Sequence, residues 1–208
     1  MAKTWIRALA AGVLGLVVVG IVGWQAGWLK TASPERPAIP GVIWEAPVGG
    51  PFTLVAHDGR TVTEKDMEGK LTLMFFGYRF CPDFCPTELQ KFSEVLAQLG
   101  PGADQVQAWF VSVDPARDKP ADLAEYVALF DPKITGLSGS DEQVAGAAKA
   151  WRVYYAKAEQ EGSADYLMDH STYSYLMGRD GRNLAVFSYE TTPEAMVAVI
   201  KEALEEVS

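Results

Sequence analysis

Two cysteines, Cys81 and Cys85, are the only cysteines of the 208-residue chain. They lie in the run Phe-Cys-Pro-Asp-Phe-Cys-Pro, between an apolar segment and a segment with helical periodicity. The spacing Cys-x-x-Cys is common in dithiol redox proteins, whereas Cys-x-x-x-Cys more readily lets both sulfurs converge on one soft metal ion. The pair therefore indicates either a metal site or a redox-active disulfide.

The position of Cys85 favours a reactive thiolate. Cys85 immediately precedes Pro86, which suits a first helical position, and the unpaired N–H groups at a helix start stabilise a thiolate. Cys81 lies on the preceding loop, so we expect both sulfurs on one exposed loop. A disulfide that closes so short a loop would stabilise the fold little, so a Cys81–Cys85 disulfide is expected to be redox-active rather than structural.

A third metal ligand would have to be a histidine. The chain has two, and His57 lies beside a predicted hairpin turn with no tie to the cysteine loop. His170 begins a loop-to-strand segment in the second half of the chain, where it can approach that loop. Asp169 either orients His170 or caps a turn. Two thiolates and one imidazole form a soft set suited to Cu(I), and the imidazole also lets the site hold Cu(II).

The order of predicted elements indicates an α/β fold. A hairpin within 52–62 comes first, followed by a buried strand at 71–76, the cysteine loop and a helix over 87–99. Further strands and helices are predicted at 106–113, 120–130, 134–137, 141–151, 153–157, 172–177, 184–188 and 193–207, with a polar loop or hairpin tip at 159–165. Together they predict a thioredoxin-like three-layer sandwich with an N-terminal β-hairpin extension.

The N-terminal part predicts a membrane anchor. Residues 8–29 are uncharged and mostly apolar, and a membrane-spanning helix needs roughly 20 such residues. We expect a single transmembrane helix within 1–30, a Pro- and Gly-rich tether at 31–51 with a short ordered stretch at 42–44, and one domain at 52–208. Lys3 and Arg7 favour a cytoplasmic N-terminus. The expected location is the bacterial inner membrane, with the C-terminal domain in the periplasm.

The net charge of −9 argues against a nucleic acid as the partner. Binding a phosphate backbone requires a basic surface, which this composition does not favour. An acidic, soluble surface is the simplest interpretation of the charge.

Three motifs, taken in order, resemble the SCO/SenC/PrrC family. They are Gly-Tyr-Arg-Phe-Cys-Pro-Asp-Phe-Cys-Pro-Thr at 77–87, Val-Ser-Val-Asp-Pro-Ala-Arg-Asp at 111–118, and Asp-His-Ser at 169–171 with Tyr-Leu-Met and Asp-Gly after it. The resemblance covers the chain from about Phe52 to the C-terminus. It implies a membrane-anchored thioredoxin-like domain that binds copper through Cys81, Cys85 and His170.

The same resemblance implies a role in enzyme assembly. The family's best-known function is to deliver copper to, or to reduce the cysteines of, the dinuclear copper site of cytochrome c oxidase subunit II. Subunit II is therefore the expected acceptor, and an upstream periplasmic copper donor or a thiol reductant is a further expected partner. These implications describe a copper chaperone rather than an enzyme.

Two other functions stay open at this point. The chain could be a membrane-tethered thiol-disulfide oxidoreductase or redox sensor that uses Cys81 and Cys85 without metal. A thiol peroxidase would need a hydroxyl and an arginine near its reactive cysteine, and Thr87 and Arg79 could supply them.

A further acidic motif follows the strand at 106–113. Asp114 and Asp118 are expected to form a turn with local hydrogen bonds and a surface pair with Arg117. We do not expect them to bind the metal.

Overall fold

The computed structural model describes residues 36, 38–159 and 166–205. The predicted transmembrane helix lies outside these residues, as does most of the first half of the tether. Among the described residues, no helix has the length and apolar character needed to cross a membrane.

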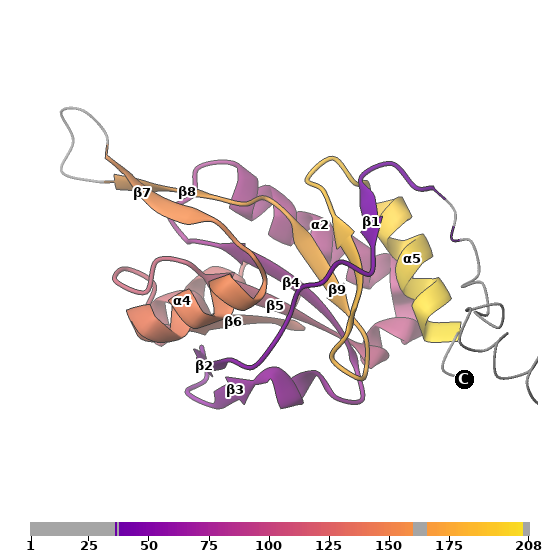
Figure 1. Cartoon of the computed structure of the whole chain (residues 1–208), viewed down its shortest axis with the longest axis horizontal. Coiled ribbons are helices and arrows are strands. Elements are labelled where there is room, and N and C mark those ends of the chain that lie inside the picture. Colours follow the sequence, from indigo (N-terminus) through magenta and orange to yellow (C-terminus); the bar gives the residue numbers. More distant parts are fainter. Residues whose placement is uncertain (1–35, 37, 160–165, 206–208) are drawn as a thin grey trace, which may run out of the picture. The chain divides into compact units, whose positions relative to one another are not determined.

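A mixed sheet forms the centre of the described chain (Figure 1). Its eight strands within the described residues are, in spatial order, β1 (Val42–Trp44), β10 (Asn183–Phe187), β9 (Ser174–Met177), β4 (Leu71–Gly77), β5 (Val106–Ser112), β6 (Ile134–Ser138), β2 (Thr53–Ala56) and β3 (Thr61–Thr63). Strands β4, β5 and β6 run parallel, and the other neighbours pair antiparallel. Two further strands, β7 (Tyr155–Glu159) and β8 (Tyr166–His170), form a separate hairpin-like sheet.

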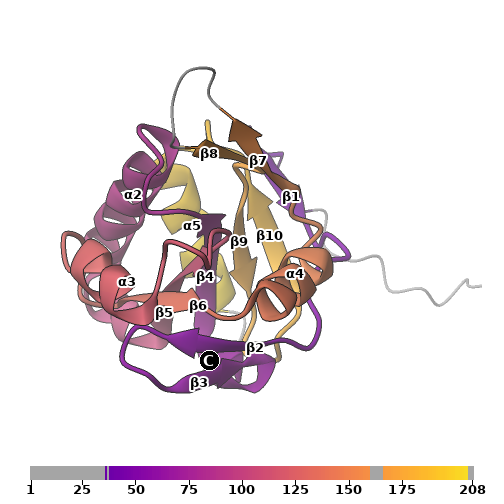
Figure 2. The same cartoon turned by 90° about the vertical axis from the view of Figure 1, so that its left-hand side faces the viewer.

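Helices cover both faces of the central sheet. The α-helices are α2 (Phe84–Leu99), α3 (Pro120–Val127), α4 (Asp141–Ala150) and α5 (Pro193–Glu205), and the 3-10 helices are η1 (Glu64–Met67) and η2 (Gly100–Gln105). Figure 2 shows α2, α3 and α5 on one face and α4 on the other. This arrangement confirms the predicted thioredoxin-like α/β sandwich of three layers.

Strand β4 lies at the centre because every one of its side chains is apolar or small enough to be buried. Phe75 packs against Phe110 on the face that carries α2 and α3, with ring centroids 6.4 Å apart. Phe76 points to the opposite face, where its ring lies 6.1 Å from that of Trp151. The strand therefore ends in the interior, and its carboxyl end leads directly into the cysteine loop.

Most element predictions are confirmed, with three differences. The predicted hairpin is present as β2 and β3, and the ordered stretch at 42–44 is β1, whose pairing with β10 brings part of the expected tether into the sheet. Helix α2 begins at Phe84 rather than at Thr87, so Pro86 lies inside its first turn. The missing N–H of proline costs no hydrogen bond there, because N–H groups of the first turn have no intrahelical acceptor. Strand β8 was not predicted, because its sequence Tyr-Leu-Met-Asp-His lacks a clear alternation of apolar and polar residues.

Gly77 allows α2 to begin directly against the end of β4. A Cβ atom at this position would lie 2.8 Å from Cys85 Sγ and 2.8 Å from the Phe110 ring. Such a contact is well inside normal packing distance, so any larger residue must displace the cysteine or the ring.

We therefore expect Gly77→Ala to destabilise the domain by about 1–3 kcal/mol through overpacking. The control is Gly146→Ala in α4, where an added Cβ meets nothing within 4 Å. Alanine has the higher helix propensity, so this variant should gain about 0.5–1 kcal/mol. Urea unfolding of both variants measures the two changes, and equal stabilities would contradict the proposed crowding at Gly77.

Candidate metal centre

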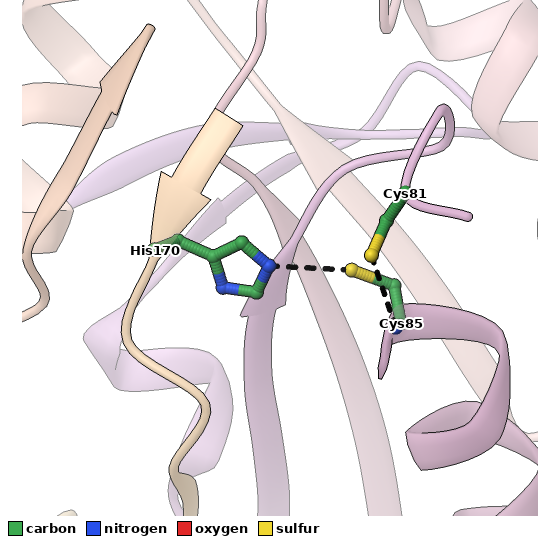
Figure 3. A group of neighbouring side chains, drawn as sticks. All are labelled: Cys81, Cys85 and His170. Carbon is green, nitrogen blue, oxygen red and sulfur yellow. Dashed lines mark hydrogen bonds between the residues drawn. The ribbon is translucent and has the colours of Figure 1, made fainter. Parts of the chain in front are cut away.

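Three donor side chains converge from three elements at the carboxyl end of β4 (Figure 3). Cys81 lies in the loop after β4, where its backbone N–H donates to the Tyr78 carbonyl at 3.3 Å. Cys85 is the second residue of α2, and His170 is the last residue of β8. The cysteine Sγ atoms and one imidazole nitrogen all lie within 4.8 Å of one another.

Short contacts link the three donors. Cys85 Sγ lies 3.4 Å from His170 Nε2, and Cys81 Sγ accepts a hydrogen bond of 3.4 Å from the backbone N–H of Cys85. The first turn of a helix has N–H groups without intrahelical acceptors, and here one of them is directed at the Cys81 sulfur. The two cysteines are not joined by a disulfide.

The imidazole of His170 is oriented by a backbone carbonyl. Nδ1 lies 2.9 Å from the Ser171 carbonyl oxygen, which can only accept, so Nδ1 carries the proton and the lone pair of Nε2 faces the sulfurs. The rings of Phe75 and Tyr78 contact the imidazole edge-on, each with a centroid distance of 5.8 Å. Asp169 is exposed. The orienting role considered for Asp169 therefore belongs to the Ser171 carbonyl.

The two thiols differ in their protonation. The hydrogen bond from the Cys85 thiol is the main cause that lowers the pKa of Cys81 to about 4; burial opposes it, and hydrogen bonds from the backbone N–H groups of Asp83 and Cys85 support it. Burial, together with the bond to Cys81, raises the pKa of Cys85 far above its usual range. Cys81 is the thiolate and Cys85 the protonated donor.

Two expectations about the cysteines are therefore wrong. Cys85 was expected to be the activated thiolate on an exposed loop, but it has no exposed surface and Cys81 is only 9% exposed. The reason is that α2 begins one residue before Cys85, which turns the side chain of Cys85 inward and directs its N–H at Cys81 instead. Phe80 and Phe84, which directly precede the two cysteines in the sequence, have exposed rings.

The other residues singled out in the sequence lie outside the donor group. His57 Nδ1 accepts a hydrogen bond of 3.0 Å from the backbone N–H of Gly136. The Thr87 hydroxyl donates to the Asp83 carbonyl at 2.9 Å, so its hydrogen bond stays within the first turn of α2. Arg79 pairs with carboxylates on the other side of its loop, the nearer contact being 3.4 Å to Asp122. These contacts give no support to a peroxidase site.

The expected turn with local hydrogen bonds at Asp114 and Asp118 and the pairing of Asp114 with Arg117 are confirmed, but the expected surface location is wrong, because both carboxylates are buried. Asp118 accepts hydrogen bonds from the Ser112 hydroxyl at 2.6 Å and from the backbone N–H of Arg79 at 3.1 Å, which fixes the start of the cysteine loop. Burial raises the pKa of Asp118. An acidic residue that directly follows a fully buried strand was the signal for this arrangement.

Glu88 is a further buried carboxylate near the site, and sequence reasoning did not identify it. It lies one helical turn after Cys85, so the spacing places both side chains on the buried face of α2. That spacing was the available signal.

The donor set fits a soft metal ion. Two sulfurs and one imidazole nitrogen provide the ligand types that Cu(I) prefers, and a three-ligand set leaves one side of the ion free for another ligand. The chemistry of these residues therefore fits copper better than a hard cation such as Mg²⁺ or Ca²⁺.

Comparisons with known proteins identify the family to which the chain is similar. The SCO1/SenC family model matches residues 43–205. Among solved structures, Bradyrhizobium japonicum ScoI with copper bound shares 47% sequence identity, with a TM-score of 0.70 over 75% of this chain and 99% of that one.

Two curated relatives, one from a plant and one from a fungus, are longer than this chain. Protein SCO1 homolog 1 of Arabidopsis thaliana, a mitochondrial protein, is 47% identical over 64% of this chain and 40% of its own length. Protein sco1 of Schizosaccharomyces pombe is 38% identical over 82% of this chain and 66% of its own. The matched region thus spans less than two thirds of each relative.

The unequal pKa values lead to a test of the site's electrostatics. As pH falls, the lowered pKa keeps Cys81 ionised until about pH 4, so the reduced protein should show one thiolate absorbance at neutral pH that disappears near that value. Cys85→Ala removes the main hydrogen-bond donor and should move the transition upward by at least about one pH unit.

Cys85→Ser is the matched control because its hydroxyl can still donate to Cys81. It should keep most of the lowered pKa. Ultraviolet absorbance of the thiolate, followed against pH, measures all three proteins, and a transition that is the same in the alanine and serine variants would contradict the assigned hydrogen bond.

Proposed function

The chain belongs to the SCO1/SenC family, and from that premise we propose that it binds one copper ion through Cys81, Cys85 and His170 and acts as a copper chaperone. Its proposed role is to deliver copper to, or to reduce the cysteines of, the dinuclear copper site of cytochrome c oxidase subunit II. The observation that carries the proposal is the convergence of two sulfurs and an imidazole nitrogen within 4.8 Å.

Release of the metal requires an accessible exchange route. A three-coordinate Cu(I) ion can accept an incoming thiolate or imidazole before it loses one of its own ligands. His170 is the ligand best suited to leave first, because it lies on a separate two-stranded sheet while both cysteines are attached to the central sheet and α2. Stepwise exchange would pass the ion to the acceptor without exposing it to water.

We also propose that the N-terminal part anchors the protein in the bacterial inner membrane, with the copper-binding domain in the periplasm. The support is the apolar run at 8–29 and the basic residues before it. An upstream copper donor and a thiol reductant in the same compartment would load the site and keep its cysteines reduced.

The test is an anaerobic Cu(I) titration of the reduced full-length chain in detergent, beside its His170→Ala variant. We expect one copper per wild-type chain. Loss of one ligand costs on the order of 3 kcal/mol, so the variant should bind about 100-fold more weakly. His57→Ala is the matched control, since this histidine lies outside the donor group, and it should leave the affinity unchanged.

Equal copper binding by the wild-type and His170→Ala chains would contradict the proposed ligand set. The assembly role has its own readout in cells. If His170→Ala and each cysteine variant leave the copper content and activity of the oxidase unchanged, the chaperone function is wrong even where copper binds.

A second candidate function is thiol-disulfide exchange, which the unequal thiols favour. The Cys81 thiolate would attack a disulfide of the acceptor, release one acceptor thiolate and form a mixed disulfide. Cys85 would then lose its proton, attack Cys81 Sγ and release the second acceptor thiol. Two electrons move from the pair to the acceptor, and a thiol reductant must restore the pair.

This second function predicts a distinct pattern of variants. Reduction of a disulfide in a subunit II peptide should fall below detection with Cys81→Ser, whereas Cys85→Ser should stop at the mixed disulfide and release only one peptide thiol. Full reduction should persist in His170→Ala and in the presence of a copper chelator. Thiol titration of the peptide with time measures the exchange. Loss of exchange on chelation would assign the observed activity to copper instead.

A further inference from the structure

His170 lies in a segment that joins two different sheets. Strand β8, which ends at His170, pairs only with β7 within the described residues, whereas β9 begins at Ser174 inside the central sheet. The backbone of β8 is therefore not hydrogen-bonded to the sheet that positions the cysteines. Besides the ring contacts of Phe75 and Tyr78 with the imidazole, side-chain contacts on either side of His170 link this segment to the central sheet and to α2.

The first set of contacts lies at Tyr166, four residues before His170. The Tyr166 hydroxyl donates to Asp114 Oδ1 at 2.7 Å, and Arg117 Nη1 donates to the Tyr166 carbonyl at 2.9 Å. The Arg117 guanidinium also lies over the Tyr166 ring, 3.6 Å from its centroid, and pairs with Asp114. These contacts attach the beginning of β8 to the end of β5.

The second set of contacts lies at Ser174, four residues after His170. The Ser174 hydroxyl donates to Glu88 Oε1 at 2.6 Å, and Lys91 Nζ donates to Glu88 Oε2 at 2.8 Å. Ser174 has no exposed surface and Glu88 is 1% exposed. Glu88 follows Cys85 by one helical turn, so this bond ties the segment after His170 to the helix that carries a cysteine.

Both acceptors are carboxylates in an interior where an unpaired charge is strongly unfavourable. The side chain of Asp114 is 1% exposed, and that of its partner Arg117 is 20% exposed. An apolar pair could fill the same volumes without a desolvation cost. Unlike an apolar side chain, each carboxylate accepts a hydrogen bond from one hydroxyl, and this bond fixes the position of the residue that carries the hydroxyl.

We propose that Asp114 and Glu88 are positioning residues for copper binding, which act through Tyr166 and Ser174 to hold His170 Nε2 beside the two sulfurs. This inference rests on the proposed copper function. The two contacts restrain the nine-residue segment 166–174 at both ends, with the imidazole at its middle. Removing either contact lets His170 move away from the cysteines while leaving the cysteines in place.

The test compares Tyr166→Phe and Ser174→Ala in the full-length chain, because each removes a hydroxyl and keeps the rest of the shape. Each should weaken Cu(I) binding about fivefold, the effect of one hydrogen bond of ordinary strength. Tyr154→Phe is the matched control, since Tyr154 is 63% exposed and lies outside both sets of contacts. Its affinity should equal that of the wild type.

The decisive measurement repeats each substitution in the His170→Ala background. If the contacts act by positioning His170, their removal should change the affinity no further, because the ligand is already absent. An equal fivefold loss in that background would overturn the inference, since it would show an effect on the cysteines or on the whole fold. Unchanged affinity of both single variants would overturn it as well.

A copper-free measurement separates this inference from the proposed function. In the reduced, metal-free chain, nitrogen NMR of the two histidine rings should show a shifted or broadened His170 signal in both variants, with His57 unchanged as an internal reference. If His170→Ala binds copper as tightly as the wild type, the proposed function fails and this NMR result alone decides the positioning role. An unchanged His170 signal overturns it.

Discussion

Burial of an ionised sulfur is the constraint on which the site depends. A thiolate removed from water is unfavourable unless hydrogen bonds replace its hydration. Cys81 receives such bonds from the Cys85 thiol and from the backbone N–H of Cys85. Both donors belong to the first turn of α2, so the helix must begin against the end of β4, and Gly77 leaves the space for it. The end of β4, the cysteine loop and the first turn of α2 therefore stabilise the thiolate together.

His170 is held by other elements than the two cysteines, and this difference separates the requirements of dithiol exchange from those of copper binding. The cysteines belong to the central β4–α2 unit, whose packing is fixed by the core. The histidine belongs to β8, which lies in the separate sheet (Figure 1). Dithiol exchange needs only the first unit, whereas a three-ligand copper site needs both. The proposed thiol exchange therefore requires only the β4–α2 unit, whereas the proposed copper binding also requires the β8 segment to be in place.

Sequence patterns predicted the central elements well because those elements follow local rules. The apolar run at 71–76, the helical spacing after Cys85 and the Asp-Gly hairpin turn each depend on neighbouring residues alone. The three proposed ligands were named because the cysteine spacing and the motif resemblance both pointed to them. The burial of Cys85 was missed because it depends on α2 beginning two residues earlier than Pro86 suggested. Strand β8 was missed because its pairing partner, rather than its own sequence, defines it.

The positions of the buried carboxylates could not be predicted, since each also accepts a hydrogen bond from a residue far away in the sequence: Glu88 from Ser174, Asp114 from Tyr166 and Asp118 from Arg79. Around the site, three of them have a basic side chain beside them: Glu88 with Lys91, Asp114 with Arg117, and Asp118 with Arg79. Because Glu88 and Asp114 are closely paired, each pair contributes little net field at the sulfurs. Asp118 is less well balanced, as Arg79 Nε lies 3.7 Å from Oδ1.

The pairs of Glu88 and Asp114 therefore do not serve to set the charge of the site, whereas the charge of Asp118 helps to raise the pKa of Cys85. A hydrogen bond to a carboxylate has a defined length and direction, which an apolar contact lacks. Asp118 holds the cysteine loop, and Glu88 and Asp114 contact the residues on either side of His170. Buried carboxylates contact each segment that carries or adjoins a donor, so the relative placement of the donors depends on hydrogen bonds whose geometry is sharper than that of the surrounding apolar packing.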